Sequence, residues 1–229
     1  MAKMLSKQNS TPLFLRSTLR HIRLCNRIYG DNKYSQAINP LYETLQEKYD
    51  RYEMMKLDRY FASDNLFMCD HMLDNDIRTS HESCNQYERE NNDAFLLDTF
   101  FPNGRFGDII RKSKAKELNI VEQLALKFET LGDQHPLFKL AAELREGISK
   151  VRRAMEEYNE AIREEKLALA EVDIAKEALR KQYAKNYFDA KQEKGRVKAD
   201  FMFPAITSKL KEVPVEEISD TPDQTAQAA

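Results

Sequence analysis

No glycine or proline occurs from Leu41 to Phe101, and this feature constrains the fold more than any other. Sheets and doubly wound folds need frequent turns, and turns depend heavily on these two residue types. The whole chain holds only 6 Gly and 7 Pro among 229 residues. The sequence therefore predicts an all-α fold built on long helices.

Start and stop signals predict the first helices. Pro12 opens a helix that runs to about Tyr29, because apolar residues recur there at helical spacing and Gly30 supplies a C-terminal stop. Asn39-Pro40 predicts the next helix start, with an N-cap followed by Pro at the first helical position. A break is expected at 63–65, where three capping residues precede an apolar residue.

The segment 100–108, FFPNGRFGD, is the clearest interruption in the second part of the chain. A helix is expected to resume near Ile109 and to end at Gly132. Asp133 then predicts the N-cap of a last helix that runs to about Phe201, because the two glycines within it need not break it.

Apolar residues in this last helix alternate at spacings of four and three, which is typical of a heptad seam. Glu165 and Lys176 interrupt the seam, either as register-setting positions or as points where it rotates outward. A second stripe with the same spacing is expected on the long helix before it. The seam residues are Leu144, Ile148, Val151, Met155, Tyr158, Ile162, Leu169, Val172, Leu179, Tyr183 and Tyr187, and the second stripe is Leu66, Cys69, Leu73, Ile77, Ser80, Cys84 and Tyr87.

The predicted architecture is an elongated helical bundle, with two long antiparallel helical stretches and two shorter helices. The domain prediction is a flexible N-terminus at 1–11, helical halves at 12–104 and 105–211 within one bundle, and a disordered acidic tail at 212–229. A shift of 102 residues lays Gly30-Asp31 on Gly132-Asp133 and Phe101-Pro102 on Phe203-Pro204. This pattern is consistent with an internal duplication and pseudo-two-fold packing, or with coincidence between two helical halves.

The formal net charge of −2 does not mark the whole chain as a polyanion binder. No apolar run approaches the roughly 20 residues of a membrane span. The start of the chain lacks a signal-peptide core, although residues 1–30 contain no acid and also fit a transit peptide. Three widely spaced cysteines argue against a disulfide framework, so a cytoplasmic location is expected.

Cys69, His71, His81 and Cys84 are candidate zinc ligands, because paired Cys and His residues supply tetrahedral ligands. Residues 69 and 71 cannot share a helix face, so such a site requires an unwound segment. The same cysteines fit the second stripe as small core residues. A di-iron centre lacks its Glu-x-x-His pairs. The sequence therefore predicts no metal, cofactor or catalytic residue.

Basic residues form the remaining candidate site, for nucleic-acid binding. Two groups of them fall in corresponding parts of the two halves, where they could neutralise phosphates. The alternative is a solvated or salt-bridged helix face. These residues are Arg16, Arg20, Arg23, Arg27, Arg105, Arg111, Lys112, Lys114 and Lys116.

The sequence thus predicts a non-enzymatic helical scaffold or protein-interaction protein that binds a protein partner or a second copy of itself. A nucleic-acid-binding protein that uses the basic faces at 16–27 and 105–116 is the alternative.

Overall fold

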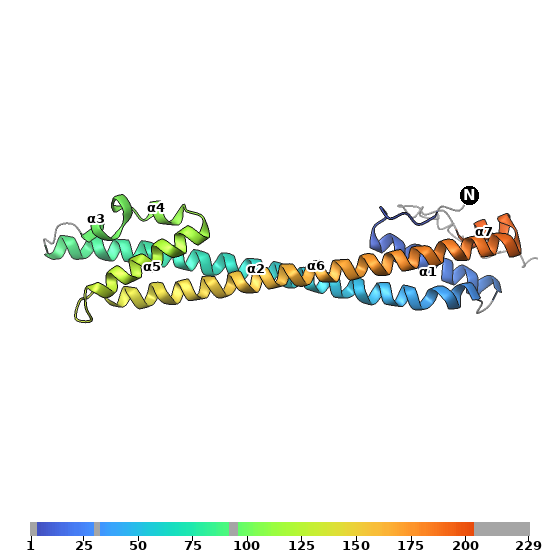
Figure 1. Ribbon diagram of the computed structural model, residues 1–229, viewed down its shortest axis with the longest axis horizontal. Helices are drawn as coiled ribbons and strands as arrows, with labels where there is room; N and C mark the ends of the chain where they lie inside the picture. The colour runs from blue at the N-terminus through green and yellow to red at the C-terminus, as the bar shows by residue number, and fades with distance from the viewer. Residues whose placement is uncertain (1–3, 30–32, 92–95, 204–229) are drawn as a thin grey trace, which may run out of the picture. The chain divides into compact units, whose positions relative to one another are not determined.

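The computed structural model describes residues 4–29, 33–91 and 96–203, and every regular element in these ranges is helical (Figure 1). The two long helices, α2 and α6, pack against each other, which confirms the all-α prediction. Their contacts run in antiparallel order, from Arg51 with Glu171 to Asn65 with Glu157. The elements are α1 (Thr11–Tyr29), α2 (Lys33–Asn91), α3 (Leu96–Phe100), the 3-10 helix η1 (Pro102–Gly104), α4 (Gly107–Ile110), α5 (Lys114–Thr130), α6 (Lys139–Lys194) and α7 (Arg196–Met202).

The chain divides into two compact units. Unit 1 combines residues 1–42 with 176–229, and unit 2 consists of residues 43–175. Both α2 and α6 therefore contribute one part to each unit. The predicted halves, 12–104 and 105–211, are a different division, since the boundary between them falls inside unit 2.

The prediction for α1 is confirmed within one residue, since the helix runs from Thr11 to Tyr29. The stop expected at Gly30 lies outside the described residues, as does the acidic tail at 212–229. Residues 4–10 form a turn before α1, in which the Ser6 amide donates to the Asn9 side chain.

Both breaks predicted near and within α2 are wrong. The helix begins at Lys33 and continues through Pro40, because Tyr34 and Ile38, in the turns before the proline, are buried in the unit 1 core and anchor this part of the helix. The capping residues at 63–65 also stay helical. Asn65 donates to Glu157 of α6, 3.2 Å away, instead of capping a helix start.

The interruption around residue 103 is confirmed. Asn103 and Gly104 both adopt positive φ angles, 56° and 65°, which continuous helix does not allow. The helix expected from Ile109 is instead two helices, because α4 ends at Ile110 and α5 begins only at Lys114. Ser113, in an extended conformation, occupies the N-cap position of α5.

The end of α5 at Gly132 is confirmed, since this glycine has a φ of 82°. The predicted start of the last helix at Asp133 is wrong, because α6 begins at Lys139. The ring of His135 instead accepts a hydrogen bond from the Leu137 amide, 3.2 Å away, which stabilises a turn before the helix.

The last helix also ends earlier than predicted. Gly195 has φ 81° and ψ 162°, a region of backbone conformation that is open almost only to glycine, and it separates α6 from α7. The chain then turns so that Met202 and Phe203 are buried in unit 1. Gly195 therefore breaks the helix that the sequence predicted to continue.

The predicted seam of α6 is confirmed at most positions and wrong at Leu169. That residue is exposed, while its neighbour Ala168 is buried. Glu165 forms an ion pair with Arg59 of α2, and the Lys176 ammonium lies 5.2 Å from the ring centre of Phe14. The buried seam residues are Leu144, Ile148, Val151, Val172, Leu179 and Tyr183.

The hydrophobic core of unit 2 joins α2 and α6 with the helices between them. Leu73, Ile77 and Cys84 of α2 are buried, which confirms the second predicted stripe. The other core residues come from α3 to α6, and include Phe101, Ile109, Val121, Phe128, Leu144 and Ile148. This core covers only part of the unit, and the rest of the α2–α6 pair in unit 2 has no third helix beside it (Figure 1).

The core of unit 1 is held by specific polar contacts as well as apolar ones. The buried Asn186 side chain of α6 donates to the backbone carbonyl of Tyr34, 2.8 Å away. The Tyr34 hydroxyl in turn donates to Glu193 at 2.8 Å. These contacts tie the start of α2 to the end of α6.

The element order repeats along the chain. A medium, a long and a short helix follow one another as α1–α2–α3 and again as α5–α6–α7. Phe101 and Phe203, which correspond under the shift of 102 residues, are both buried. The order of the helices fits the duplication, whereas the pseudo-two-fold packing stays a prediction.

Candidate protein-interaction surface

An exposed apolar stripe lies on α2 within unit 2. It consists of Met54, Leu57, Phe61, Met68 and Met72, whose exposed fractions range from 48% to 69%. At 100° per residue these side chains fall within about 60° of one another around the helix. They extend along about 27 Å of it. We call this set the α2 stripe.

The α2 stripe faces away from the buried side of the same helix. The centre of the buried side, marked by Leu73, Ile77 and Cys84, lies roughly 140° around the helix from the stripe. A single surface helix normally carries one apolar face. The α2 helix therefore has a second apolar face that no described residue of unit 2 covers.

Two aromatic residues widen the stripe on one side. Tyr60 and Phe67 are 46% and 69% exposed, and Arg59 stacks over the Tyr60 ring at 4.6 Å. With about 200 Å² of surface for each large side chain, the seven residues expose on the order of 800 Å². Contiguous apolar patches above a few hundred Å² are typical of interaction surfaces in soluble proteins.

Ion pairs join α2 and α6 at the section of the α2 stripe and just before it. Lys48 and Arg51 both pair with Glu171, at 3.2 and 3.3 Å. Arg59 pairs with Glu165 at 2.5 Å. The α6 seam in this section contributes small or partly buried residues, so the large apolar side chains of α2 are left on the opposite face.

The predicted basic residues fall into two groups that belong to different units. Arg16, Arg20, Arg23 and Arg27 are exposed on α1, and they follow one face of that helix as the spacing predicts. In unit 2, Arg105, Arg111, Lys112 and Lys116 are exposed. The structure therefore displays both groups at the surface, and the role in nucleic-acid binding stays a prediction.

Lys114 differs from the other predicted basic residues because carboxylates already neutralise it. Its ammonium group is paired with Asp70 of α2, and it lies 3.2 Å from Glu117 of its own helix. Asp70, Asp74 and Glu117 bring their carboxylate oxygens within 4.8 Å of one another. Burial raises the pKa of Glu117 to about 7, with Asp74 adding to the rise and Lys114 opposing it.

The cysteines and histidines weighed as zinc ligands have other surroundings. His81 bonds through Nε2 with the carbonyl of Gly104, 3.0 Å away, and packs edge-on against Phe101. His71 is exposed, and Cys84 is buried among apolar residues. Burial raises the pKa of Cys84 to about 12, which keeps it a protonated core thiol.

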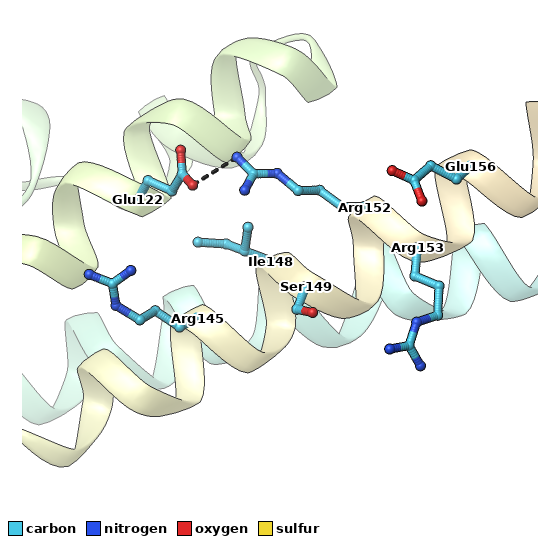
Figure 2. Close-up of a pocket in the computed structure, with 7 residues that line it drawn as sticks. All are labelled: Glu122, Arg145, Ile148, Ser149, Arg152, Arg153 and Glu156. Atoms are coloured by element: carbon cyan, nitrogen blue, oxygen red, sulfur yellow. Dashed lines mark ion pairs between the residues drawn. The ribbon is translucent and has the colours of Figure 1, made fainter.

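A shallow hollow of about 330 Å³ lies between α5 and α6 (Figure 2). Three arginines reach into its surroundings, but two of them are paired: Arg152 with Glu122 at 2.8 Å, and Arg145 with Glu129 at 2.6 Å. Arg153 points away from Glu122 in Figure 2. The ion pairs around the hollow therefore form a polar link between α5 and α6.

Unit 1 contains a buried histidine that the sequence did not single out. His21 is fully buried, bonds through Nδ1 with the carbonyl of Met202 at 3.0 Å, and stacks near Phe203 with ring centres 4.0 Å apart. Burial lowers the pKa of His21 to about 4. This neutral imidazole fixes α7 against α1.

The α2 stripe was also missed, although the sequence carried a signal for it. Met54, Leu57, Phe61 and Met68 recur at spacings of three, four and seven, on the same helix as the predicted stripe from Leu66 to Tyr87. Two apolar stripes on one helix indicate a buried face and a second, exposed apolar face.

Comparison with known proteins gives this surface no precedent: no protein-family model, no curated protein and no solved structure matches the chain. Among the described residues, no helix is both long and apolar enough to cross a membrane.

Proposed function

We propose that this chain is a non-enzymatic helical scaffold that binds an α-helix of a protein partner along the α2 stripe. The observation that carries the proposal is the second apolar face of α2, formed by Met54, Leu57, Phe61, Met68 and Met72. A straight stripe at three-four spacing is complementary to another helix of the same kind. Its methionines suit such a surface, because flexible thioethers adapt to the partner.

Several titratable groups in the described cores support a scaffold over an enzyme, because they have structural partners. The His21 ring is hydrogen-bonded to the carbonyl of Met202, and the His81 ring to the carbonyl of Gly104. Glu117 faces Lys114. The three cysteines are free thiols, which fits the reducing cytoplasm included in this proposal.

Photo-crosslinking in cells tests the proposed function. A benzoylphenylalanine placed at Phe61 should yield a discrete crosslinked protein, whose attachment peptide, identified by mass spectrometry, is an amphipathic helix. The same group at the exposed Lys166 of α6 serves as the control and should give little product. Equal crosslinking from both positions, or none from Phe61, would count against the stripe as a docking surface.

Nucleic-acid binding is the second candidate, favoured by the exposed arginine face of α1. An oligonucleotide should then bind with an affinity that falls steeply as salt rises. Reversal of charge at Arg20 and Arg23, as Arg20→Glu with Arg23→Glu, should weaken binding at least 10-fold. Binding that survives this double reversal removes the candidate.

A further inference from the structure

We infer that the helix that binds the α2 stripe is α2 of a second copy of this chain, paired antiparallel about a two-fold axis near residues 63 and 64. This inference rests on the proposed function and names its partner. The exposed apolar area supports this inference first, since about 800 Å² from each copy is the area that each partner contributes to a standard protein interface.

The spacing of the stripe supports the antiparallel arrangement. Across an axis near residues 63 and 64, Met54 of one copy faces Met72 of the other, and Leu57 faces Met68. Phe61 lies beside Asn65, and the flanking Tyr60 lies against Phe67. The apolar residues of the α2 stripe thus meet apolar residues at each turn except the central one. The two copies of α2 supply both apolar faces of the pair, so no helix from another protein is needed.

Charge favours this arrangement over a parallel pair. A parallel pair would place Asp50, which lies within the arc of the α2 stripe, against Asp50 of the other copy, and this like-charge contact is unfavourable.

The mass of the full chain across protein concentration is the first test. The wild-type chain should pass from monomer to dimer, and Phe61→Glu with Met68→Glu should weaken the dimer by about 100-fold or more, because it buries like charges at the seam. Leu167→Glu with Ile174→Glu is the matched control, since it charges two equally exposed apolar residues of α6 in the same unit. That control should dimerise as the wild type does. A wild-type monomer at all concentrations, or loss of the dimer in the α6 control alone, overturns the inference.

Crosslinking between cysteines tests the orientation. The background is Cys69→Ser, because Cys25 and Cys84 are buried thiols whose pKa values burial raises to about 12. The Met54→Cys variant alone and the Met72→Cys variant alone should each give little crosslinked dimer. A mixture of the two variants should give a crosslinked dimer. Strong crosslinking of either variant alone indicates a parallel pair and overturns the inference, as does a dimer that the mixture fails to crosslink.

The two proposals fail in different ways. In one outcome, the chain is monomeric while its Phe61 position still crosslinks to a helix of another protein in cells. That outcome rules out the second copy as the partner and leaves the proposed docking surface in place. A monomeric chain with no crosslink at Phe61 removes both.

Discussion

A methyl group on Gly147 of α6 would lie 2.8 Å from Cδ1 of Leu73 of α2, closer than side-chain carbon atoms approach one another. The Oδ2 atom of Asp76 of α2 would lie 3.2 Å from the same methyl group. The glycine therefore marks a point of close approach between the two long helices of unit 2. Its absence of a side chain serves packing, although the sequence suggests only a weak point in a helix.

Gly147→Ala should destabilise unit 2. A gain of about 1 kcal/mol from helix propensity is opposed by overpacking against the buried Leu73, which costs roughly 1–3 kcal/mol. Denaturant unfolding of the full chain measures the net loss. Gly107→Ala is the control, since nothing lies within 4 Å of the added carbon there. Equal stability of the two variants would show that α2 and α6 approach less closely than described.

Pro40→Ala should stabilise unit 1 by roughly 1–3 kcal/mol. Proline inside a helix removes one hydrogen bond and crowds the preceding turn, and alanine restores both. Pro12→Ala is the control, because Pro12 lies in the first turn of α1, where no intrahelical donor is needed. That variant should change the thermal midpoint little. A Pro40→Ala chain of lower stability would indicate that α2 does not continue through this residue.

The buried carboxyl of Glu117 should make unit 2 less stable as pH rises from about 4.5 to about 7. The folded state keeps the proton until about pH 7, whereas the unfolded chain releases it near 4.5, so folding binds the extra proton in this window. Glu117→Gln should flatten that dependence, and Glu122→Gln on the same helix should not. Hydrogen exchange of α5 amides at several pH values gives the measurement. Parallel slopes in all three chains would contradict the burial described.

His21 should give unit 1 the opposite response to acid. Its folded pKa of about 4 lies below the ordinary 6.5, so the unfolded chain binds the extra proton between these values. Stability is full above pH 6.5 and falls as pH is lowered toward 4. His21→Gln keeps an amide donor for Met202 and should reduce this fall, as read from exchange of α1 and α7 amides. An unchanged slope would place the titrating group elsewhere.

Local signals predicted the features that depend on one helix alone. The α1 range and the Gly132 stop followed from spacing and from glycine conformation. The buried stripe of α2 followed from its three-four periodicity. Each of these depends only on residues close together in the sequence.

Features that depend on distant residues could not be read in the same way. Helix continuity through Pro40 depends on burial of its neighbours in unit 1, and continuity at Asn65 on a hydrogen bond to α6. Buried alanines such as Ala168 carry no strong hydrophobic signal, so the pattern predicts Leu169 at the seam instead. The α2 stripe cannot be predicted when each helix is assumed to have a single apolar face.

The division of α2 and α6 between the two units also sets an order of events during synthesis. Unit 2 is contiguous, so its helices can meet as soon as residue 175 has left the ribosome. Unit 1 needs residues 1–42 and the segment after 175 together. At typical translation rates, the first segment therefore waits on the order of 10 s for its partner. During that interval the apolar face of α1 is exposed in the nascent chain, which makes it a natural target for chaperones.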